Sequence, residues 1–97
     1  MHILLVGLNH KSAPIELRER AAFQHEHLAA AFERLRKEVG LREMAILSTC
    51  NRVEIYGGAA ELDGTMDRLR RFLSDHGHLE RPGLGEHLYS FMEPHSV

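Results

Sequence analysis

The stretch MAILSTCNRVEIY, from Met44 to Tyr56, contains two strand-like segments around a short polar loop. Met44–Leu47 is a continuous apolar run, which is typical of a strand at the centre of a sheet. Val53–Tyr56 alternates apolar and polar residues, as a strand with one less buried face does. Only Ser48–Arg52 separates the two, a length that suits a β-hairpin. The stretch therefore predicts two adjacent antiparallel strands.

The segments on either side of this hairpin predict helices and two further strands. Ile3–Val6 is apolar throughout and ends at Gly7, so we expect a strand that is buried on both faces. Apolar residues at helical spacing from Leu28 to Val39 predict an amphipathic helix, which Gly40 ends. The other expected elements are a helix over Ile15–Phe23 capped by Ser12 or Ala13 with Pro14 in its first turn, a helix capped by Asp63 or Thr65 and stopped by Gly77, a loop over Leu79–Gly85 and an edge strand over His87–Met92.

The order strand, helices, strand, strand, helix, strand predicts an α+β domain of the split βαβ type (βαββαβ, ferredoxin-like). In this arrangement the sheet is antiparallel and the helices cover one of its faces. The chain has 97 residues, enough for one hydrophobic core and too few for two, so we expect residues 1–97 to form a single domain. Because Pro94–Val97 carries neither a terminal helix nor a polar tail, we expect a piece of a longer protein.

Composition argues against several classes of protein. Lys and Arg number 12 and Asp and Glu 14, so the net charge is −2 and no bulk positive field attracts nucleic acid. The longest strongly apolar run, Ile3–Val6, is far too short to span a bilayer, and the N-terminus does not resemble a signal peptide. A single cysteine, Cys50, cannot form an internal disulfide, which suits a reducing cytosol. We expect a cytoplasmic protein without a membrane partner.

The loop of the predicted hairpin carries the most reactive set of side chains. Cys50 attacks as its thiolate, and nearby positive charge activates such a thiol. Arg52, a permanent cation two residues on, could lower the pKa of the thiol or bind a substrate carboxylate through two parallel hydrogen bonds. Thr49 and Asn51 add a hydroxyl and an amide that could orient a polar substrate. The residue types therefore indicate a nucleophile with a carboxylate-binding partner.

The loop after the first strand, with His10 and Ser12, is a second candidate part of this site. In a split βαβ fold the ends of neighbouring central strands can converge, which would bring His10 near Cys50. The alternative is an inert Cys50, because free cysteine often fills a buried apolar position. Fast alkylation would support the catalytic interpretation, and reaction only after denaturation would support the inert one.

The spacing of the histidines does not favour a metal site. His25 and His27 stand two residues apart, as do His76 and His78, and side chains at that spacing diverge on a helix. A second cysteine to complete a soft tetrahedral site is also missing from the sequence. We therefore predict no metal. Neither the dinucleotide fingerprint nor the P-loop pattern occurs in the sequence.

Two motifs resemble one enzyme family. Gly7–Glu19 (GLNHKSAPIELRE) and Leu47–Tyr56 (LSTCNRVEIY) look like the N-terminal catalytic domain of glutamyl-tRNA reductase. The resemblance spans essentially the whole chain, and Ala59–Gly85 adds little to it. Ser12 stands where the family often has threonine, so the hydroxyl is kept.

The resemblance implies the first committed step of tetrapyrrole synthesis from glutamate, by way of 5-aminolevulinate. Cys50 matches the family cysteine that attacks the ester of glutamyl-tRNA and forms a thioester, which NADPH reduces to glutamate-1-semialdehyde. Thr49, Asn51 and Arg52 fall in the family's substrate-binding loop, and Arg52 would clamp the γ-carboxylate of glutamate.

The resemblance also implies parts that lie beyond Val97. The family's NADPH-binding and dimerisation domains are expected to follow, together with a histidine used near the thiol. The full-length protein would then be a homodimer, with glutamate-1-semialdehyde aminomutase as a partner. We expect the isolated chain to make no semialdehyde from glutamyl-tRNA and NADPH.

A binding module for RNA or a small molecule is the alternative, because the same fold serves such domains. The sequence has few aromatic residues for a base-stacking platform. Arg68, Arg70 and Arg71 are expected on a solvated helix face, with contact to tRNA phosphates as the other interpretation.

Overall fold

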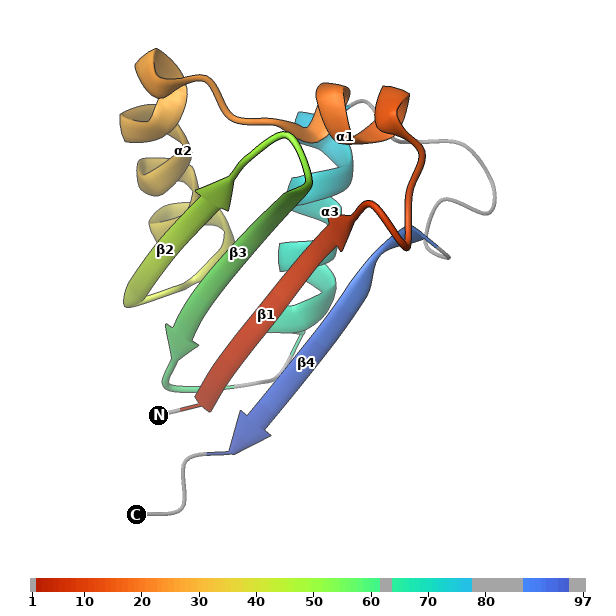
Figure 1. Cartoon of the computed structure of the whole chain (residues 1–97). Helices are drawn as coiled ribbons and strands as arrows, with labels where there is room; N and C mark the ends of the chain where they lie inside the picture. Colours follow the sequence, from red (N-terminus) through yellow and green to blue (C-terminus); the bar gives the residue numbers. More distant parts are fainter. Residues whose placement is uncertain (1, 62–63, 78–86, 95–97) are drawn as a thin grey trace.

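The computed structural model describes residues 2–61, 64–77 and 87–94, and these form a four-stranded sheet with helices (Figure 1). In chain order the elements are β1 (His2–Asn9), α1 (Ile15–Ala21), the 3-10 turn η1 (His25–His27), α2 (Leu28–Arg34), the π-helical turn η2 (Leu35–Val39), β2 (Glu43–Ser48), β3 (Arg52–Ala59), α3 (Thr65–His76) and β4 (Tyr89–Pro94). The predicted α+β class and order of elements are confirmed. The predicted loop over Leu79–Gly85 and the predicted cap Asp63 lie outside the described residues.

The strands lie in the order β2-β3-β1-β4, and every neighbouring pair is antiparallel. β1 and β3 pair along their whole length, from His2–Ala59 to Asn9–Arg52, and so occupy the centre. The prediction of a central strand at Met44–Leu47 is wrong, because β2 is an edge strand. Its apolar character has a different cause: Met44 and Ile46 pack against the core, while Leu47 is exposed on the other face.

The hydrophobic core lies between the sheet and the helices, which cover one face (Figure 1). Leu4, Val6 and Leu8 alternate along β1 on the covered face and are fully buried, and α3 contributes Leu69 and Leu73. Burial of a side chain of this size contributes about 1.5–3 kcal/mol. This layer of aliphatic side chains holds α3 across β1.

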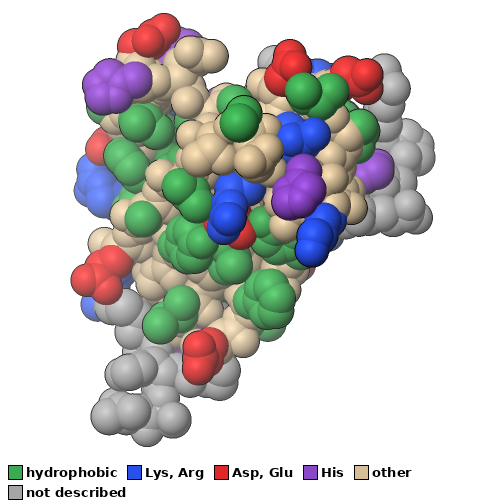
Figure 2. Space-filling view, viewed as in Figure 1, with side chains coloured by type: hydrophobic (Ala, Val, Ile, Leu, Met, Phe, Trp, Pro, Cys, Tyr) green, Lys and Arg blue, Asp and Glu red, His purple; other side chains and the backbone are tan. Residues whose placement is uncertain are grey.

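The opposite face of the sheet is open to solvent on the described residues. Ile3 is 49% exposed, so the prediction that Ile3–Val6 is buried on both faces is wrong. The helices reach one face only, and the odd-numbered residues of β1 point away from them. Leu5 pairs with Tyr56 on β3 and with Phe91 on β4, which sets an apolar row across this face. Figure 2 shows hydrophobic side chains spread over the sheet on this side.

The first helix begins at Ile15 as predicted, but it ends at Ala21, before the predicted Phe23, and its cap differs. Pro14 occupies the N-cap position of α1 and no side chain caps the helix, so the assignment of the cap to Ser12 or Ala13 is wrong. Ser12 is engaged elsewhere, since its Oγ accepts the backbone N–H of Asn9 at 2.9 Å. It closes the loop after β1 instead of capping α1.

The later helices follow the predicted stripes with local differences. The helix predicted over Leu28–Val39 is α-helical as far as Arg34 and then widens into the π-helical turn η2. Gly40 ends it with φ of 91°, a left-handed conformation that favours glycine, as predicted. Gly64, with φ of 72°, holds the N-cap position of α3, and Thr65 is its first helical residue.

Two of the three arginines of α3 brace the fold. Arg68 donates to the carbonyl of Val39 from Nε at 3.3 Å and from Nη2 at 3.2 Å. Arg70 Nη1 donates to Ser90 Oγ on β4 at 3.0 Å. Arg68 and Arg71 are exposed, as predicted, and Arg70 is half-buried; the sequence did not indicate that Arg68 and Arg70 also form these hydrogen bonds.

Leu69 offers a direct test of this core. We expect Leu69→Ala to lower the free energy of unfolding by about 2–5 kcal/mol, because a cavity opens between α3 and the sheet. Ile15→Ala, at a position that is 54% exposed, is the matched control and should change it by less than about 1 kcal/mol. Urea unfolding followed by far-UV circular dichroism measures both. Equal losses in the two variants would contradict the assigned core.

Candidate active site

The hairpin between β2 and β3 presents Cys50 at its tip, and the residue is exposed. The turn is tight: Thr49 N–H donates to the carbonyl of Arg52 at 2.8 Å. Thr49 Oγ1 accepts the backbone N–H groups of Asn51 and Arg52, each at 3.2 Å. The Thr49 hydroxyl therefore ties the start of the turn to the backbone that follows the cysteine. The interpretation of Cys50 as a buried apolar filler is wrong for this structure.

A second set of hydrogen bonds fixes the tip against the start of the chain. Arg18 of α1 donates from Nη1 to the carbonyl of Cys50 at 2.9 Å and from Nε to the carbonyl of Ala13 at 3.2 Å. Ser48 Oγ accepts the backbone N–H of Phe23 at 3.0 Å. Sequence reasoning missed Arg18, although it lies inside the first of the two motifs. Nothing in the sequence distinguished Arg18 from an ordinary surface arginine, because the buried face of its predicted helix was poorly defined.

The loop after β1 lies at the same end of the sheet as the hairpin tip. Asn9 pairs with Arg52 in the register of β1 and β3, which places the start of this loop beside the start of β3. Asn9 Oδ1 accepts the N–H groups of Lys11 at 2.9 Å and Ser12 at 3.0 Å, so the loop is closed on itself. His10 lies in this loop and is exposed.

Arg52 lies next to a carboxylate that is almost completely buried. The Arg52 side chain is 54% exposed, and its Nη1 lies 3.7 Å from Oε1 of Glu54. Glu54 is 6% exposed and accepts the hydroxyl of Tyr56 at 2.5 Å and that of Tyr89 at 2.7 Å. Sequence reasoning assigned no role to Glu54, because alternation in Val53–Tyr56 is equally typical of a solvated position.

The protonation states of this cluster follow from its contacts. Burial raises the pKa of Glu54, but hydrogen bonds from Tyr56 and Tyr89 and the charge of Arg52 outweigh it, so the pKa lies below its usual value. Burial and the hydrogen bond to Glu54 raise the pKa of Tyr89. At neutral pH the cluster therefore contains an ionised carboxylate and a protonated phenol that donates to it.

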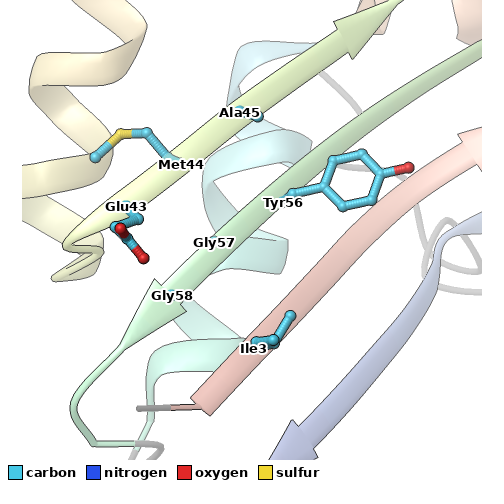
Figure 3. A pocket seen from close by; sticks show the side chains of 7 residues that line it. All are labelled: Ile3, Glu43, Met44, Ala45, Tyr56, Gly57 and Gly58. Carbon is cyan, nitrogen blue, oxygen red and sulfur yellow. The ribbon is translucent and has the colours of Figure 1, made fainter. Parts of the chain in front are cut away.

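A shallow pocket of about 510 Å³ lies elsewhere on the open face (Figure 3). Its lining residues are Ile3, Glu43, Met44, Ala45, Tyr56, Gly57 and Gly58. Gly58 pairs with Glu43 and Ile3 at the far end of the sheet, six residues along β3 from Arg52, which is roughly 20 Å of extended strand. The pocket is mostly apolar and lies apart from the thiol.

Residues 2–61, 64–77 and 87–94 offer neither a metal site nor a membrane-spanning helix. Within these ranges, no group of three or more His, Cys, Asp or Glu side chains is placed to hold a metal ion. Among the same residues, no helix has both the length and the apolar character needed to cross a bilayer. His78 falls outside this part of the chain.

Fold and site together define an α+β domain that presents an exposed thiol on a hairpin tip, which Arg18 braces through the backbone carbonyl of Cys50, two residues before Arg52. The family model of the glutamyl-tRNA(Glu) reductase N-terminal domain matches residues 6–97. The chain belongs to this family, as the N-terminal domain of a glutamyl-tRNA reductase, and the resemblance seen in the two motifs is confirmed.

Individual relatives agree with this assignment. A glutamyl-tRNA reductase of Heliobacterium mobile is 40% identical over 89 residues, which cover 92% of this chain and 20% of that protein. A glutamyl-tRNA reductase of Pelobacter propionicus is 42% identical over 91 residues, which cover 94% of this chain and 21% of that protein. The solved glutamyl-tRNA reductase from Methanopyrus kandleri matches 94% of this chain and 18% of its own, with 27% identity and a TM-score of 0.57. The chain spans about a fifth of the length of these relatives.

The turn around Cys50 can be tested through Thr49. We expect Thr49→Val, which keeps the shape but removes the acceptor for two backbone N–H groups, to lower stability by about 1 kcal/mol and to loosen the tip. Backbone order parameters from ¹⁵N relaxation at Asn51 and Arg52 measure the loosening. Thr49→Ser keeps the hydroxyl and is the control. Unchanged order parameters in Thr49→Val would show that the hydroxyl does not hold the turn.

Proposed function

We propose that Cys50 is the nucleophile of an NADPH-dependent glutamyl-tRNA reductase and forms a thioester with the glutamyl group of glutamyl-tRNA. The observation that carries this proposal is the exposed thiol on a braced hairpin tip, two residues before Arg52, within a chain of this family. An exposed tip suits a macromolecular substrate, because the acceptor end of a tRNA need not enter a closed cavity.

The covalent step exchanges one acyl bond for another. The thiolate Sγ of Cys50 attacks the carbonyl carbon of the ester, the bond from that carbon to the tRNA oxygen breaks, and the terminal ribose hydroxyl leaves with the proton given up by the thiol. Arg52 binds the γ-carboxylate of the glutamyl group, for which its half-exposed guanidinium is accessible. Asn51 and Thr49 lie on either side of the nucleophile, and Thr49 acts by holding the turn. His10 and Ser12 belong to the loop after β1, at the same end of the sheet as the hairpin tip, and we propose this loop as the second part of the site.

Reduction requires residues that this chain does not supply. Neither glycine pattern used to bind nucleotide phosphates occurs in the sequence. We propose that NADPH binds elsewhere in the longer protein, so no step through it is assigned to these residues. The product would be glutamate-1-semialdehyde, on the route to 5-aminolevulinate and tetrapyrroles.

The wider setting is part of the same proposal. The full-length protein would be a cytoplasmic homodimer joined through regions outside this chain, with glutamate-1-semialdehyde aminomutase taking up the reactive product. For the fold we propose the split βαβ, ferredoxin-like type. The order β2-β3-β1-β4 supports it, since one antiparallel strand separates β1 from β2 and β3 from β4.

A chimera tests the proposal in a complete enzyme. This chain replaces the matching residues of the Heliobacterium mobile reductase, and the product is incubated with glutamyl-tRNA without NADPH. We expect a glutamyl adduct on Cys50 by mass spectrometry, because the thioester should accumulate when it is not reduced. With NADPH, semialdehyde should form.

Two variants and one truncated protein serve as controls. Cys50→Ala should abolish both adduct and semialdehyde, and Arg52→Gln should reduce adduct formation about a hundredfold, since the charged partner of the substrate carboxylate is lost. The isolated chain should yield no semialdehyde. An adduct that persists in Cys50→Ala, or semialdehyde from the isolated chain, would refute the proposal.

A further inference from the structure

Glu54 is nearly buried, although it lies on the face of the sheet that the helices do not cover. An ionised carboxylate loses hydration in such a place and is retained only where hydrogen bonds or opposite charge replace it. Here two phenols and one guanidinium do so. The carboxylate is therefore held by several groups at once, two residues along β3 from Arg52.

β1 leaves space for this side chain at Gly7. Gly7 pairs directly with Glu54 on one side and with Tyr89 on the other. A Cβ atom at Gly7 would lie 2.8 Å from Cγ of Glu54 and 2.7 Å from the carbonyl oxygen of Val53. Because this position lacks a side chain, the carboxylate can lie across β1 and meet the hydroxyl of Tyr89 from the strand beyond.

The two tyrosines fix both oxygens of the carboxylate. Tyr56 donates to Oε1 and Tyr89 donates to Oε2, so rotation of the carboxylate would break at least one hydrogen bond. Hydrogen bonds to an ionised acceptor are short and about twice as strong as neutral ones. Oε1, the oxygen that faces Nη1 of Arg52, is thereby held in one place.

We propose that Glu54, locked by Tyr56 and Tyr89, is a positioning residue that orients the guanidinium of Arg52 toward the carboxylate of the incoming acyl group. This inference rests on the proposed function of Cys50 and Arg52. An arginine on a half-exposed surface samples many rotamers, and a fixed anion beside Nη1 restricts them while other N–H groups stay available. Glu54, Tyr56 and Tyr89 thus set selectivity for glutamyl over glutaminyl substrates through Arg52, without touching the reacting atoms.

The test compares glutamyl-tRNA with glutaminyl-tRNA built on the same tRNA, using the chimera described above. The readout is the ratio of the rates of adduct formation on Cys50 at low substrate. We expect Tyr56→Phe/Tyr89→Phe to lower this ratio about tenfold, because Arg52 keeps its charge but loses its fixed anion. Glu54→Gln should lower it by a similar factor. The effect should fall on KM for glutamyl-tRNA more than on kcat.

Matched controls separate positioning from general damage. Phe91→Leu removes an aromatic side chain from the same strand as Tyr89, and Glu43→Gln removes a carboxylate from the same face. Neither should change the ratio. Alkylation of Cys50 by uncharged iodoacetamide should keep its rate in every variant, which shows that the thiol and the hairpin are intact.

The outcomes also distinguish this inference from the proposed function. If the unaltered chimera forms no adduct, the proposed function fails. If it forms the adduct but the tyrosine double variant keeps the full preference for glutamyl-tRNA, the positioning role is overturned. A rise of the ratio in Glu54→Gln would likewise overturn it, because Glu54 would then only weaken the field of Arg52.

Discussion

The antiparallel pairing of β1 with β3 is the contact on which the site depends. It places Asn9 beside Arg52 and Gly7 beside Glu54, so the loop after the first strand and the start of the third strand share one end of the sheet. The same pairing puts the aliphatic side of both strands against the helices, where burial supplies the driving force. A slip of one residue would turn Glu54 into the core and its apolar neighbours outward. Stability and site geometry are therefore fixed by the same register.

Local sequence patterns were sufficient to predict the elements and their order, but not to predict where each strand lies in the sheet or which of its faces is covered. The hairpin at Ser48–Arg52 and the stop at Gly40 follow from turn residues and periodicity, and the last strand was predicted as an edge strand over His87–Met92 but lies two residues later, at Tyr89–Pro94. Burial on both faces at Ile3–Val6 and a central place for Met44–Leu47 were wrong for one physical reason. An apolar run looks the same whether helices cover one face of the sheet or both, and whether the strand lies at the centre or at an edge. Only the placement of the helices, for Ile3–Val6, and the strand order, for Met44–Leu47, distinguish these cases.

The site was predictable where its chemistry is local and not where it is assembled across strands. Cys50 and Arg52 are two residues apart, so their proximity can be read from the chain. Arg18 reaches the hairpin from a helix 32 residues earlier, and Tyr89 reaches Glu54 from 35 residues later. Neither contact has a signature in spacing or composition. The buried state of Glu54 also depends on an absent side chain at Gly7, which acquires meaning only once the register is known.

The separation of the two functional groups also fits the substrate proposed for them. Two residues of extended chain span about 6.6 Å, and a tight turn shortens that span. In a glutamyl ester, the reacting carbonyl carbon and the acid at the other end of the five-carbon chain are about 5 Å apart when the chain is extended. The Cα spacing of Cys50 and Arg52 is of the same order as this length, so in the proposed function the two side chains would engage opposite ends of one acyl group. The carbonyl of Cys50 is held by Arg18 and the guanidinium of Arg52 faces Glu54, so each end has its own brace. Under the proposed function, selectivity for the length of the acyl chain would come from the braced backbone of the turn, and selectivity for the acid would come from Arg52.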